Sequence, residues 1–400
     1  MGNTPNIRFK GFTNDWEQRK VSELSEKTFG GGTPKTSNDS FWKGNIPWIQ
    51  SSDLVEGSLF DVEPRKYISQ EAVDKSATKL VPEKSVAIVT RVGVGKLAFM
   101  PFSYATSQDF LSLSVLKTEP QFTVYALYKK LQSELNDVQG TSIKGVTKDE
   151  LLAKEVMIPC YKEQEKIGSY LHSLDHLITL HQRKCDETKK LKKFMLQKMF
   201  PKKDAKKPEI RFAGFTDDWE QRKLGEVFQE YSEKNHPELP ALTIIQGGGT
   251  VLREESERKL QYDKSSLAGY KMVREDDFIV HLRSFEGGLE KSNHNGLISP
   301  AYHTFHGDEV DSRFYYPYFR SYEFIKHKLV PHVYGIRDGR SIDIDGMKTI
   351  EIPWTLYEEQ KKIGDYIESL DTLITLHQRK CDELKEFKKY MLQNMFPQKG

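Results

Sequence analysis

The chain has 400 residues, of which 37% are hydrophobic and 11% are aromatic, and its formal net charge is +2 at pH 7. This composition excludes a disordered chain and is typical of a folded protein with two or three domains. The sequence has no apolar run of the roughly 18 residues that a membrane span needs, and no signal-peptide pattern at its N-terminus. Its three cysteines give no disulfide framework, so we expect a cytoplasmic protein.

The first element is an opening segment, residues 7–24, which returns with few changes as residues 210–227. Both copies contain the pattern Gly-Phe-Thr-x-Asp-Trp-Glu-Gln-Arg-Lys, at residues 11–20 and 214–223. Two copies at such a long period indicate a tandem pair of similar halves, because solenoid proteins are built from three or more short repeats.

A globular region follows each opening segment. Its sequence differs between the halves, except at a few matching positions. At a fixed offset of 192 residues, Arg91 matches Arg283 and Gly95 matches Gly287. In both halves the arginine follows an apolar run typical of a strand and precedes a turn that contains glycine. We therefore expect one α+β fold in both regions, with a different binding surface on each.

A long helix is predicted after each globular region, at about residues 163–199 and again from residue 359. Residues 163–201 and 359–397 are identical at 29 of 39 positions. Apolar residues recur in both helices in steps of four and three, the heptad spacing that forms a seam for a partner helix. The seam residues are Ile167, Leu171, Leu174 and Ile178 in the first helix and Ile363, Ile367, Leu370 and Ile374 in the second.

Nothing else in the chain offers a matching seam, so we expect the two helices to pack on each other as an antiparallel coiled coil with pseudo-two-fold symmetry. The sequence then predicts a first globular domain at 1–157, a long helix at 158–201, a linker at 202–209, a second globular domain at 210–351 and a second long helix at 352–397. Residues 183–207 contain eleven lysines or arginines against three acids. This run is either a solvated helix face with its connector or a stretch beside a phosphate backbone.

Motifs for catalysis are missing or incomplete. The sequence has no Asn/Asp-Pro-Pro-Tyr/Phe tetrapeptide of an amino-methyltransferase, and the stretch at residues 93–96 lacks the full spacing of a phosphate loop. His181, Cys185, His377 and Cys381 could bring four zinc ligands together at the helix midpoints. Polar seam residues that fix the helix register explain these four side chains as well. We predict no catalytic centre and no metal site.

Polar side chains on the predicted loops are candidates for contacts with DNA, because arginine and lysine suit guanine edges and glutamine suits adenine. In the first region the candidates are Thr33, Lys35, Lys43, Arg91, Lys96, Gln108, Lys144 and Lys148. In the second region they are Gln246, Arg283, Lys291, His303, Tyr334, Arg337 and Arg340. Arg91 and Arg283 stand out, because both regions place them alike. Each of the others could also be an ordinary surface or structural residue.

With these features together, the chain resembles the specificity subunit of a type I restriction–modification system over nearly its whole length. The resemblance is carried first by the pattern Glu-Gln-x-Lys-Ile-Gly…His-Gln-Arg-Lys-Cys at residues 163–185 and 359–381, and by the two opening segments. The stretch Gly-Gly-Thr-Pro at residues 31–34 and the Ile-Pro pairs at 158–159 and 352–353 also look like that family.

The resemblance implies two target-recognition domains, residues 1–157 and 210–351, joined by two long conserved helices. It implies that the chain is not an enzyme and holds no cofactor itself. It further implies docking to two modification subunits, which methylate adenine N6 from S-adenosylmethionine. Restriction subunits that depend on ATP and Mg²⁺ would join the same complex.

A protein with pseudo-two-fold symmetry binds DNA at half-sites set by the separation of its two domains. Because the two domains differ, we expect a bipartite, asymmetric site with an unread spacer. A helix of about 55 Å can hold two domains one turn of DNA, about 34 Å, apart. Inserting about four residues, or about 6 Å, into one helix should then lengthen the spacer.

Two other functions stay open at the level of sequence. A stand-alone DNA methylase or nuclease would turn over DNA without partners, which the missing motifs argue against. A coiled-coil scaffold with two protein-binding domains would lack the steep salt dependence of binding to phosphates.

Overall fold

The computed structural model describes residues 4–137, 145–202, 205–256, 264–335 and 340–397. The chain forms two compact units. Unit 1 combines residues 1–182 with residues 379–400, and unit 2 is the single stretch 183–378. This division differs from the predicted segments, because each unit contains part of both long helices together with one globular body.

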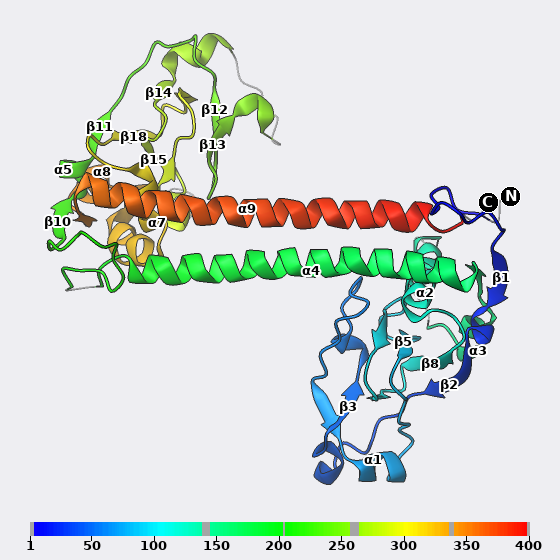
Figure 1. The fold of residues 1–400 in the computed structure, drawn as a ribbon. Helices are drawn as coiled ribbons and strands as arrows, with labels where there is room; N and C mark the ends of the chain where they lie inside the picture. The colour runs from blue at the N-terminus through cyan, green and yellow to red at the C-terminus, as the bar shows by residue number, and fades with distance from the viewer. Residues whose placement is uncertain (1–3, 138–144, 203–204, 257–263, 336–339, 398–400) are drawn as a thin grey trace. The chain divides into compact units, whose positions relative to one another are not determined.

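Unit 1 has a four-stranded antiparallel sheet at the centre of its body (Figure 1). Its strands, in spatial order, are β2 (Ser25–Gly30), β8 (Phe110–Leu116), β5 (Ser85–Val89) and β6 (Leu97–Met100). The remaining pairings place β3 (Ile46–Ile49) between β4 (Lys66–Ile68) and β7 (Ala105–Thr106), and join β1 (Glu17–Lys20) to β9 (Glu155–Ile158). The helices of the body are α1 (Gln70–Lys75), α2 (Pro120–Asp137) and α3 (Lys148–Ala153).

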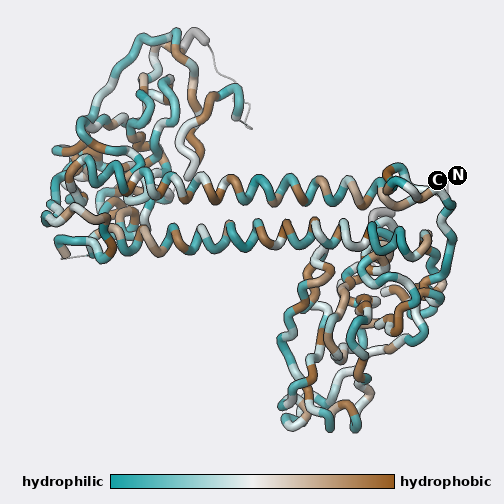
Figure 2. The backbone as a smooth tube through the Cα atoms, in the orientation of Figure 1, coloured by the Kyte–Doolittle hydropathy of each residue, from teal (hydrophilic) through white to brown (hydrophobic). Residues whose placement is uncertain are grey.

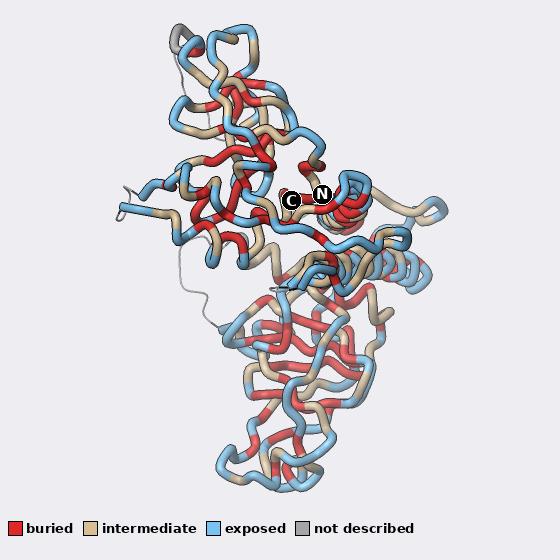
Figure 3. The backbone as a smooth tube through the Cα atoms, turned by 90° about the vertical axis from the view of Figure 1, so that its left-hand side faces the viewer, coloured by how far each residue is buried: buried red, intermediate tan, exposed pale blue. Residues whose placement is uncertain are grey.

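The core of unit 1 lies between the central sheet and α2. Every residue of β5 is buried, as expected for a strand whose sequence is Ser-Val-Ala-Ile-Val. Phe122 and Tyr125 of α2 share a core with Val86 and Ile88 of β5. Figure 3 shows buried residues inside the bodies and exposed residues along their outer segments.

Unit 2 repeats this sheet with shorter strands. In spatial order they are β11 (Gln229–Tyr231), β18 (His303–His306), β15 (Phe278–Val280) and β16 (Glu290–Lys291). Four two-stranded sheets join β10 (Glu220–Lys223) to β21 (Glu351–Trp354), β12 (Leu242–Ile245) to β13 (Gly249–Leu252), β14 (Lys271–Val273) to β17 (Gly296–Ile298), and β19 (Val333–Tyr334) to β20 (Ser341–Ile342). Its helices are α5 (Leu224–Val227), α6 (Ser284–Gly287), α7 (Ser312–Phe319) and α8 (Ile344–Lys348).

The two central sheets have the same strand order and the same register. Strand β5 pairs Val86 with Leu113, and β15 pairs Phe278 with Phe305. Each residue of the second pair follows its counterpart by 192 positions, and the pairings of β5 with β6 and of β15 with β16 obey the same offset. The predicted common α+β fold is therefore confirmed.

The two long helices, α4 (Tyr161–Lys198) and α9 (Tyr357–Asn394), have 38 residues each. They begin two residues before the expected starts at 163 and 359, but three and five residues after the segment bounds 158 and 352, where the chain is still in β9 and β21. Along both, apolar positions recur between polar ones (Figure 2). In unit 1 the thiol of Cys381 lies 3.9 Å from the carbonyl oxygen of Ile178, and Lys388 forms an ion pair with Asp175. As residue numbers rise along α9, the residues that they contact in α4 have falling numbers. The predicted antiparallel packing is therefore confirmed in this unit.

The same pattern holds in unit 2, where the thiol of Cys185 lies 3.7 Å from the carbonyl oxygen of Ile374 and Lys192 pairs with Asp371. Each of these residues is the repeat partner of one in unit 1, at an offset of 196 positions. The antiparallel pairing is therefore made by the same side-chain types in both units.

Most of the predicted seam residues also pack into the hydrophobic cores of their own units. Ile167, Leu171 and Leu174 are buried in the core that contains Phe122, and Ile363 and Ile367 are buried in the core of unit 2. Leu370 is buried as well, whereas Ile178 and Ile374 are half-buried. In the described ranges, none of the helices combines the length and the apolar character that a membrane span requires.

Candidate nucleic-acid interface

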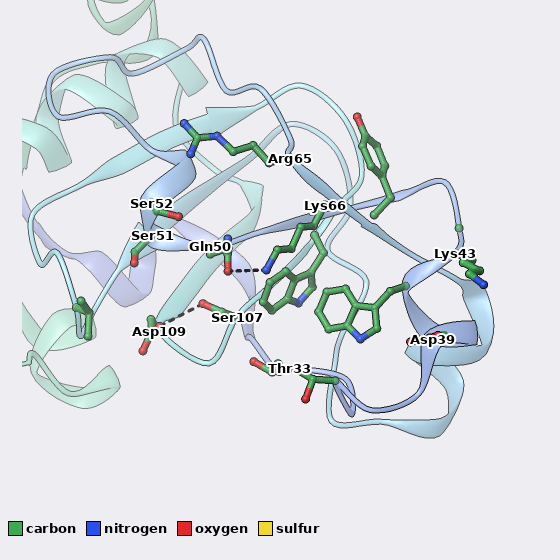
Figure 4. Close-up of a pocket in the computed structure, with 16 residues that line it drawn as sticks. Thr33, Asp39, Lys43, Gln50, Ser51, Ser52, Arg65, Lys66, Ser107 and Asp109 are labelled. Atoms are coloured by element: carbon green, nitrogen blue, oxygen red, sulfur yellow. Dashed lines mark hydrogen bonds between the residues drawn. The ribbon is translucent and has the colours of Figure 1, made fainter.

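A concavity of about 1120 Å³ opens on the body of unit 1, between the loop after β2 and the hairpin of β3 and β4 (Figure 4). The rings of Trp42 and Trp48 meet edge to face in it, with centroids 5.0 Å apart. The ammonium group of Lys66 lies 5.8 Å from one ring centroid and 5.7 Å from the other. Two of the predicted DNA contacts, Thr33 and Lys43, line this concavity.

The loop that presents Thr33 is held tightly against the sheet. The indole N–H of Trp48 donates to the carbonyl oxygen of Gly32 at 3.0 Å, and the amide of Gly32 donates to Thr106 at 2.8 Å. A Cβ atom on Gly31 would lie 1.8 Å from the carbonyl oxygen of Ser107, so only glycine fits there. The glycine pair therefore brings the loop close to β7 and leaves Thr33 exposed.

A second, smaller concavity of about 330 Å³ in unit 1 is lined by Arg91, Gln108 and Lys148. The amide of Thr90 donates to the carbonyl oxygen of Asp109, and the amide of Val146 donates to that of Thr90, both at 2.7 Å. These two bonds bring three distant segments together. Three predicted residues thus converge, although they are far apart in the sequence.

The cations of this second concavity are exposed. Within the described ranges, neither Arg91 nor Lys148 forms an ion pair. Their charges are therefore available to an anionic ligand, and lysines and arginines of this kind bind phosphates and base edges of DNA.

Two further predicted residues of unit 1 do not line either concavity. Lys35 is exposed and its carbonyl oxygen accepts a bond from the indole of Trp42 at 3.3 Å. Lys96 is half-buried, with its amine 3.5 Å from the carbonyl oxygen of Ser51. Lys144 lies outside the described residues.

In unit 2 the short helix α6 gathers three predicted residues. Arg283 directly precedes α6 and is exposed. The side chain of Gln246 lies against Gly287, where a Cβ atom would be 2.2 Å from its amide nitrogen. The guanidinium of Arg340 lies 4.4 Å from the ring centroid of Phe285 and 3.7 Å from the carboxylate of Glu286.

Two other predicted residues of unit 2 contact carboxylates. Lys291 contacts Asp276 at 2.6 Å, and His303 contacts Glu230 at 2.7 Å. Burial acts to raise the pKa of Asp276, but hydrogen bonds from Lys291 and Ser312 outweigh it and hold that pKa below its usual value. At neutral pH the charge of Lys291 is therefore compensated.

The last two predicted residues of unit 2 are Tyr334, which is 59% exposed in β19, and Arg337, which lies outside the described residues. Beside α6, burial lowers the pKa of His281, so this ring is neutral at pH 7. Its Nδ1 atom accepts the backbone N–H of Arg283 at 3.3 Å and helps to fix that residue.

Several residues of these surfaces were missed in the sequence. Gln50, Arg65, Lys66 and Tyr67 line the first concavity. The run Arg65-Lys66-Tyr67 combines two cations with an aromatic ring, a pattern typical of nucleic-acid surfaces, and could have been found. In unit 2 the buried Glu290 was missed, because its partners lie far away in the sequence.

No group of three or more histidine, cysteine, aspartate or glutamate side chains is arranged to hold a metal ion among the residues that the structure describes. The thiols of Cys185 and Cys381 instead contact helix carbonyl groups and the side-chain oxygens of Gln378 and Gln182, at 3.7 and 3.6 Å. These contacts agree with polar residues that fix the register of the helix pair.

Residues 13–190 match the family model of the type I restriction modification DNA specificity domain. The specificity subunit of the type I restriction enzyme MjaIX from Methanocaldococcus jannaschii is 27% identical over 237 residues, which are 56% of this chain and 54% of that protein. The chain thus matches about half the length of this relative.

Two further likenesses extend over almost the whole chain. The specificity subunit of a putative type I restriction enzyme, MjaX, from the same organism is 24% identical over 404 residues, which are 94% of this chain and 92% of that protein. The crystal structure of a type I restriction–modification S subunit from M. genitalium has a TM-score of 0.63 at 14% identity and covers 99% of this chain and 100% of that chain. The structural likeness shows a shared fold.

Proposed function

We propose that the chain, whose residues 13–190 match the type I restriction modification DNA specificity domain, is a specificity subunit of a type I restriction–modification system. In this proposal it reads a bipartite, asymmetric DNA site, with one half-site bound by each unit. The chain is a non-catalytic subunit in this proposal. It directs adenine-N6 methylation and DNA cleavage by the partner subunits of its complex.

The observation that carries this proposal is the placement of Arg91 and Arg283. Both follow equivalent strands of sheets with the same register, and both are exposed. Their neighbours differ completely, since Arg91 faces Gln108 and Lys148, whereas Arg283 lies by α6. One framework with two different surfaces is what two different half-sites require.

The chemistry of each surface suits DNA in a particular way. Arginine can bind the O6 and N7 atoms of guanine with two hydrogen bonds, and glutamine can bind adenine in the same manner. Lys43 and Lys148 are exposed and suit phosphates, which position the protein without reading the sequence. Each unit thus offers groups for base edges, and unit 1 adds cations for the backbone.

The long helices offer a docking surface for the partner subunits. Leu177 and its repeat partner Leu373 are 40% and 43% exposed, and Phe194 and its repeat partner Tyr390 are 47% and 53% exposed. Exposed apolar residues mark surfaces that bind other proteins. Because they occur at repeated positions, they favour two copies of one partner, one bound at each member of a repeated pair. We assign these partners as two modification subunits, which hold S-adenosylmethionine, whereas ATP and Mg²⁺ belong to the restriction subunits.

The test is a methylome. The chain is co-expressed with a modification subunit of its own genome, and N6-methyladenine is mapped by single-molecule sequencing. We expect one split, asymmetric motif that is methylated on both strands, and none when either chain is expressed alone. Methylation by this chain alone would support a stand-alone methylase instead.

A folded complex that adds no methylation would contradict the proposal. In that case a band-shift assay with random duplex decides between the remaining functions. Binding that weakens steeply with salt indicates contacts with phosphates, and binding that is absent or insensitive to salt favours a protein-binding scaffold.

A further inference from the structure

We propose that Glu290 is a positioning residue for the second half-site, because its buried carboxylate fixes the glycine turn that sets Gln246 against α6. This inference rests on the proposed function and names a specificity-determining residue that makes no contact with DNA itself. Glu290 lies in β16 and is fully buried, with 0% of its surface exposed.

The carboxylate of Glu290 accepts hydrogen bonds from four donors. Its Oε1 atom accepts the amide of Gly247 at 2.8 Å and a guanidinium N–H of Arg320. Its Oε2 atom accepts the amide of Gly249 at 3.2 Å and the hydroxyl of Tyr316 at 2.7 Å. A buried charge held by four donors is a strong and directional anchor for the backbone of the turn.

The turn between β12 and β13 fits tightly over this anchor. Gly247 and Gly249 have φ angles of +83° and +72°, which L-residues rarely adopt. A Cβ atom on Gly247 would lie 2.9 Å from a guanidinium nitrogen of Arg320, and one on Gly249 would lie 2.5 Å from the carbonyl oxygen of Lys291. The side chain of Asn293 adds a bond to Gly248 at 2.8 Å.

The fixed turn determines where Gln246 lies. This residue directly precedes the three glycines, is exposed, and places its side chain against Gly287 at the end of α6. Arg283 directly precedes the same helix. Glu290 therefore acts on recognition through the turn, by holding the amide of Gln246 at a set position relative to Arg283.

The described part of unit 1 has no equivalent of this anchor. The counterpart of Glu290 at the offset of 192 is Ala98 in β6, which pairs with Ala87 just as Glu290 pairs with Ile279. A change at Glu290 should therefore alter the second half-site and leave the first one intact.

The substitution Glu290→Gln tests the anchor. Each carboxylate oxygen faces two donors, so the amide NH₂ of glutamine meets two donors in either orientation. The Glu290→Asp variant keeps the charge and should retain part of the effect. Glu275→Gln, at an exposed glutamate of the same unit, is the matched control.

The experiment uses the complex of the full chain with its modification subunit and a DNA library with each base of both half-sites randomised. The wild-type motif should contain an adenine in the second half-site that Gln246 recognises. We expect Glu290→Gln to reduce the preference for adenine over the other bases at that position by at least about tenfold. Discrimination at the first half-site should stay within about twofold, as it should at every position for Glu275→Gln. Unchanged discrimination, or an equal loss of methylation at all sites, would overturn the proposal.

A second measurement separates this inference from the proposed function. In the free chain, Glu290→Gln should speed amide hydrogen exchange at Gly247 and Gly249 at least about tenfold, whether or not the chain binds DNA. Unchanged protection would overturn the inference even where the wild-type motif exists. If Glu290→Gln does not fold, Asn293→Ala loosens the same turn from its other side and should relax the same DNA position.

Discussion

Unit 1 and unit 2 place matching arginines on matching strands, but they hold the side chains around them in different ways. In unit 1, Arg91 and Lys148 are exposed and form no ion pair within the described residues. In unit 2, Lys291 and His303 are held by carboxylates, and a buried glutamate anchors the turn of Gln246. The comparison teaches that the sheet register is the common frame, whereas the side chains carried on that frame decide whether cations are free for phosphates or held by carboxylates.

A second difference lies at the start of the long helices. Glu163 and Glu359 are both fully buried and accept two bonds each from Arg8 and Arg211, at 2.6–2.8 Å. Only Glu359 also accepts the indole N–H of a tryptophan, at 3.0 Å, and the hydroxyl of Thr355. The equivalent indole in unit 1 has no partner in the described part of the chain. Unit 2 therefore depends on its glutamate more strongly.

The largest effect is expected from breaking these buried pairs. Glu359→Ala leaves Arg211 without its partner, and we expect a loss of about 3–5 kcal/mol in the free energy of unfolding of unit 2. Glu163→Ala should cost unit 1 about 1 kcal/mol less, because it breaks fewer hydrogen bonds. Denaturant unfolding monitored by hydrogen exchange in each unit measures both. Glu358→Ala, at an exposed neighbour, is the control, and equal losses for the two glutamates would contradict the comparison.

The next effect separates the two half-sites. Arg91→Ala and Arg283→Ala should each weaken binding by about 1–3 kcal/mol, and each should relax only the half-site of its own unit. Competition with duplexes altered in one half-site measures this in the full complex. Arg19→Ala removes an exposed arginine that pairs with Glu17 and should change neither half-site. Loss of the same half-site in both variants would show that the matching positions are not equivalent.

A smaller effect sharpens the contrast between free and paired lysines. Lys148→Ala should reduce the slope of log affinity against log salt concentration by about 0.9, because one phosphate contact is lost. Lys291→Ala should reduce it by less, since Asp276 already compensates that charge. Titrations between about 50 and 200 mM salt give both slopes. Equal reductions would mean that Lys291 leaves Asp276 when DNA binds.

The smallest effect depends on pH and is confined to unit 1. Burial lowers the pKa of Lys129 to about 8, and its amine donates to the carbonyl oxygens of Gln393 and Phe396 at 3.3 and 3.2 Å. The unfolded chain keeps this proton up to its ordinary pKa of 10.5. Between pH 8 and 10.5 the unfolded state therefore binds more protons, and unit 1 should become more stable as pH rises.

The gain should be at most about 1 kcal/mol, because the amine is partly exposed and screened by solvent. The difference in unfolding free energy between the wild type and Lys129→Met, followed across that pH range, isolates this group. Parallel curves for the two proteins would rule the effect out.

The sequence predicts the framework of this protein well, because the framework is local and repeated. Heptad spacing indicates α4 and α9, and the apolar runs before Arg91 and Arg283 indicate β5 and β15. The fixed offset of 192 even predicts which residues of β5, β6 and β8 correspond to those of β15, β16 and β18, although β2 and β11 do not follow it. Hydrophobic periodicity and repetition predict these features, and both can be read from the sequence alone.

The details of the binding surfaces depend on contacts between distant residues. Asp276 neutralises Lys291 across 15 positions, and Arg320 binds Glu290 across 30 positions. No local pattern links such pairs, so Lys291 and His303 looked like free surface groups in the sequence. An acid inside a short strand, as at Glu290, is a usable signal for a buried anchor, because carboxylates are rarely buried without partners.

Unit 1 consists of two stretches of chain, residues 1–182 and 379–400, and its core includes Met395 and Phe396, whose ring stacks on Phe122 at 5.5 Å. Translation proceeds at about 5–20 residues per second, so these side chains are synthesised roughly 10–40 s after residue 182. Unit 2 is one continuous stretch and can close its core during that interval. The half of the protein that is translated first should therefore finish folding last.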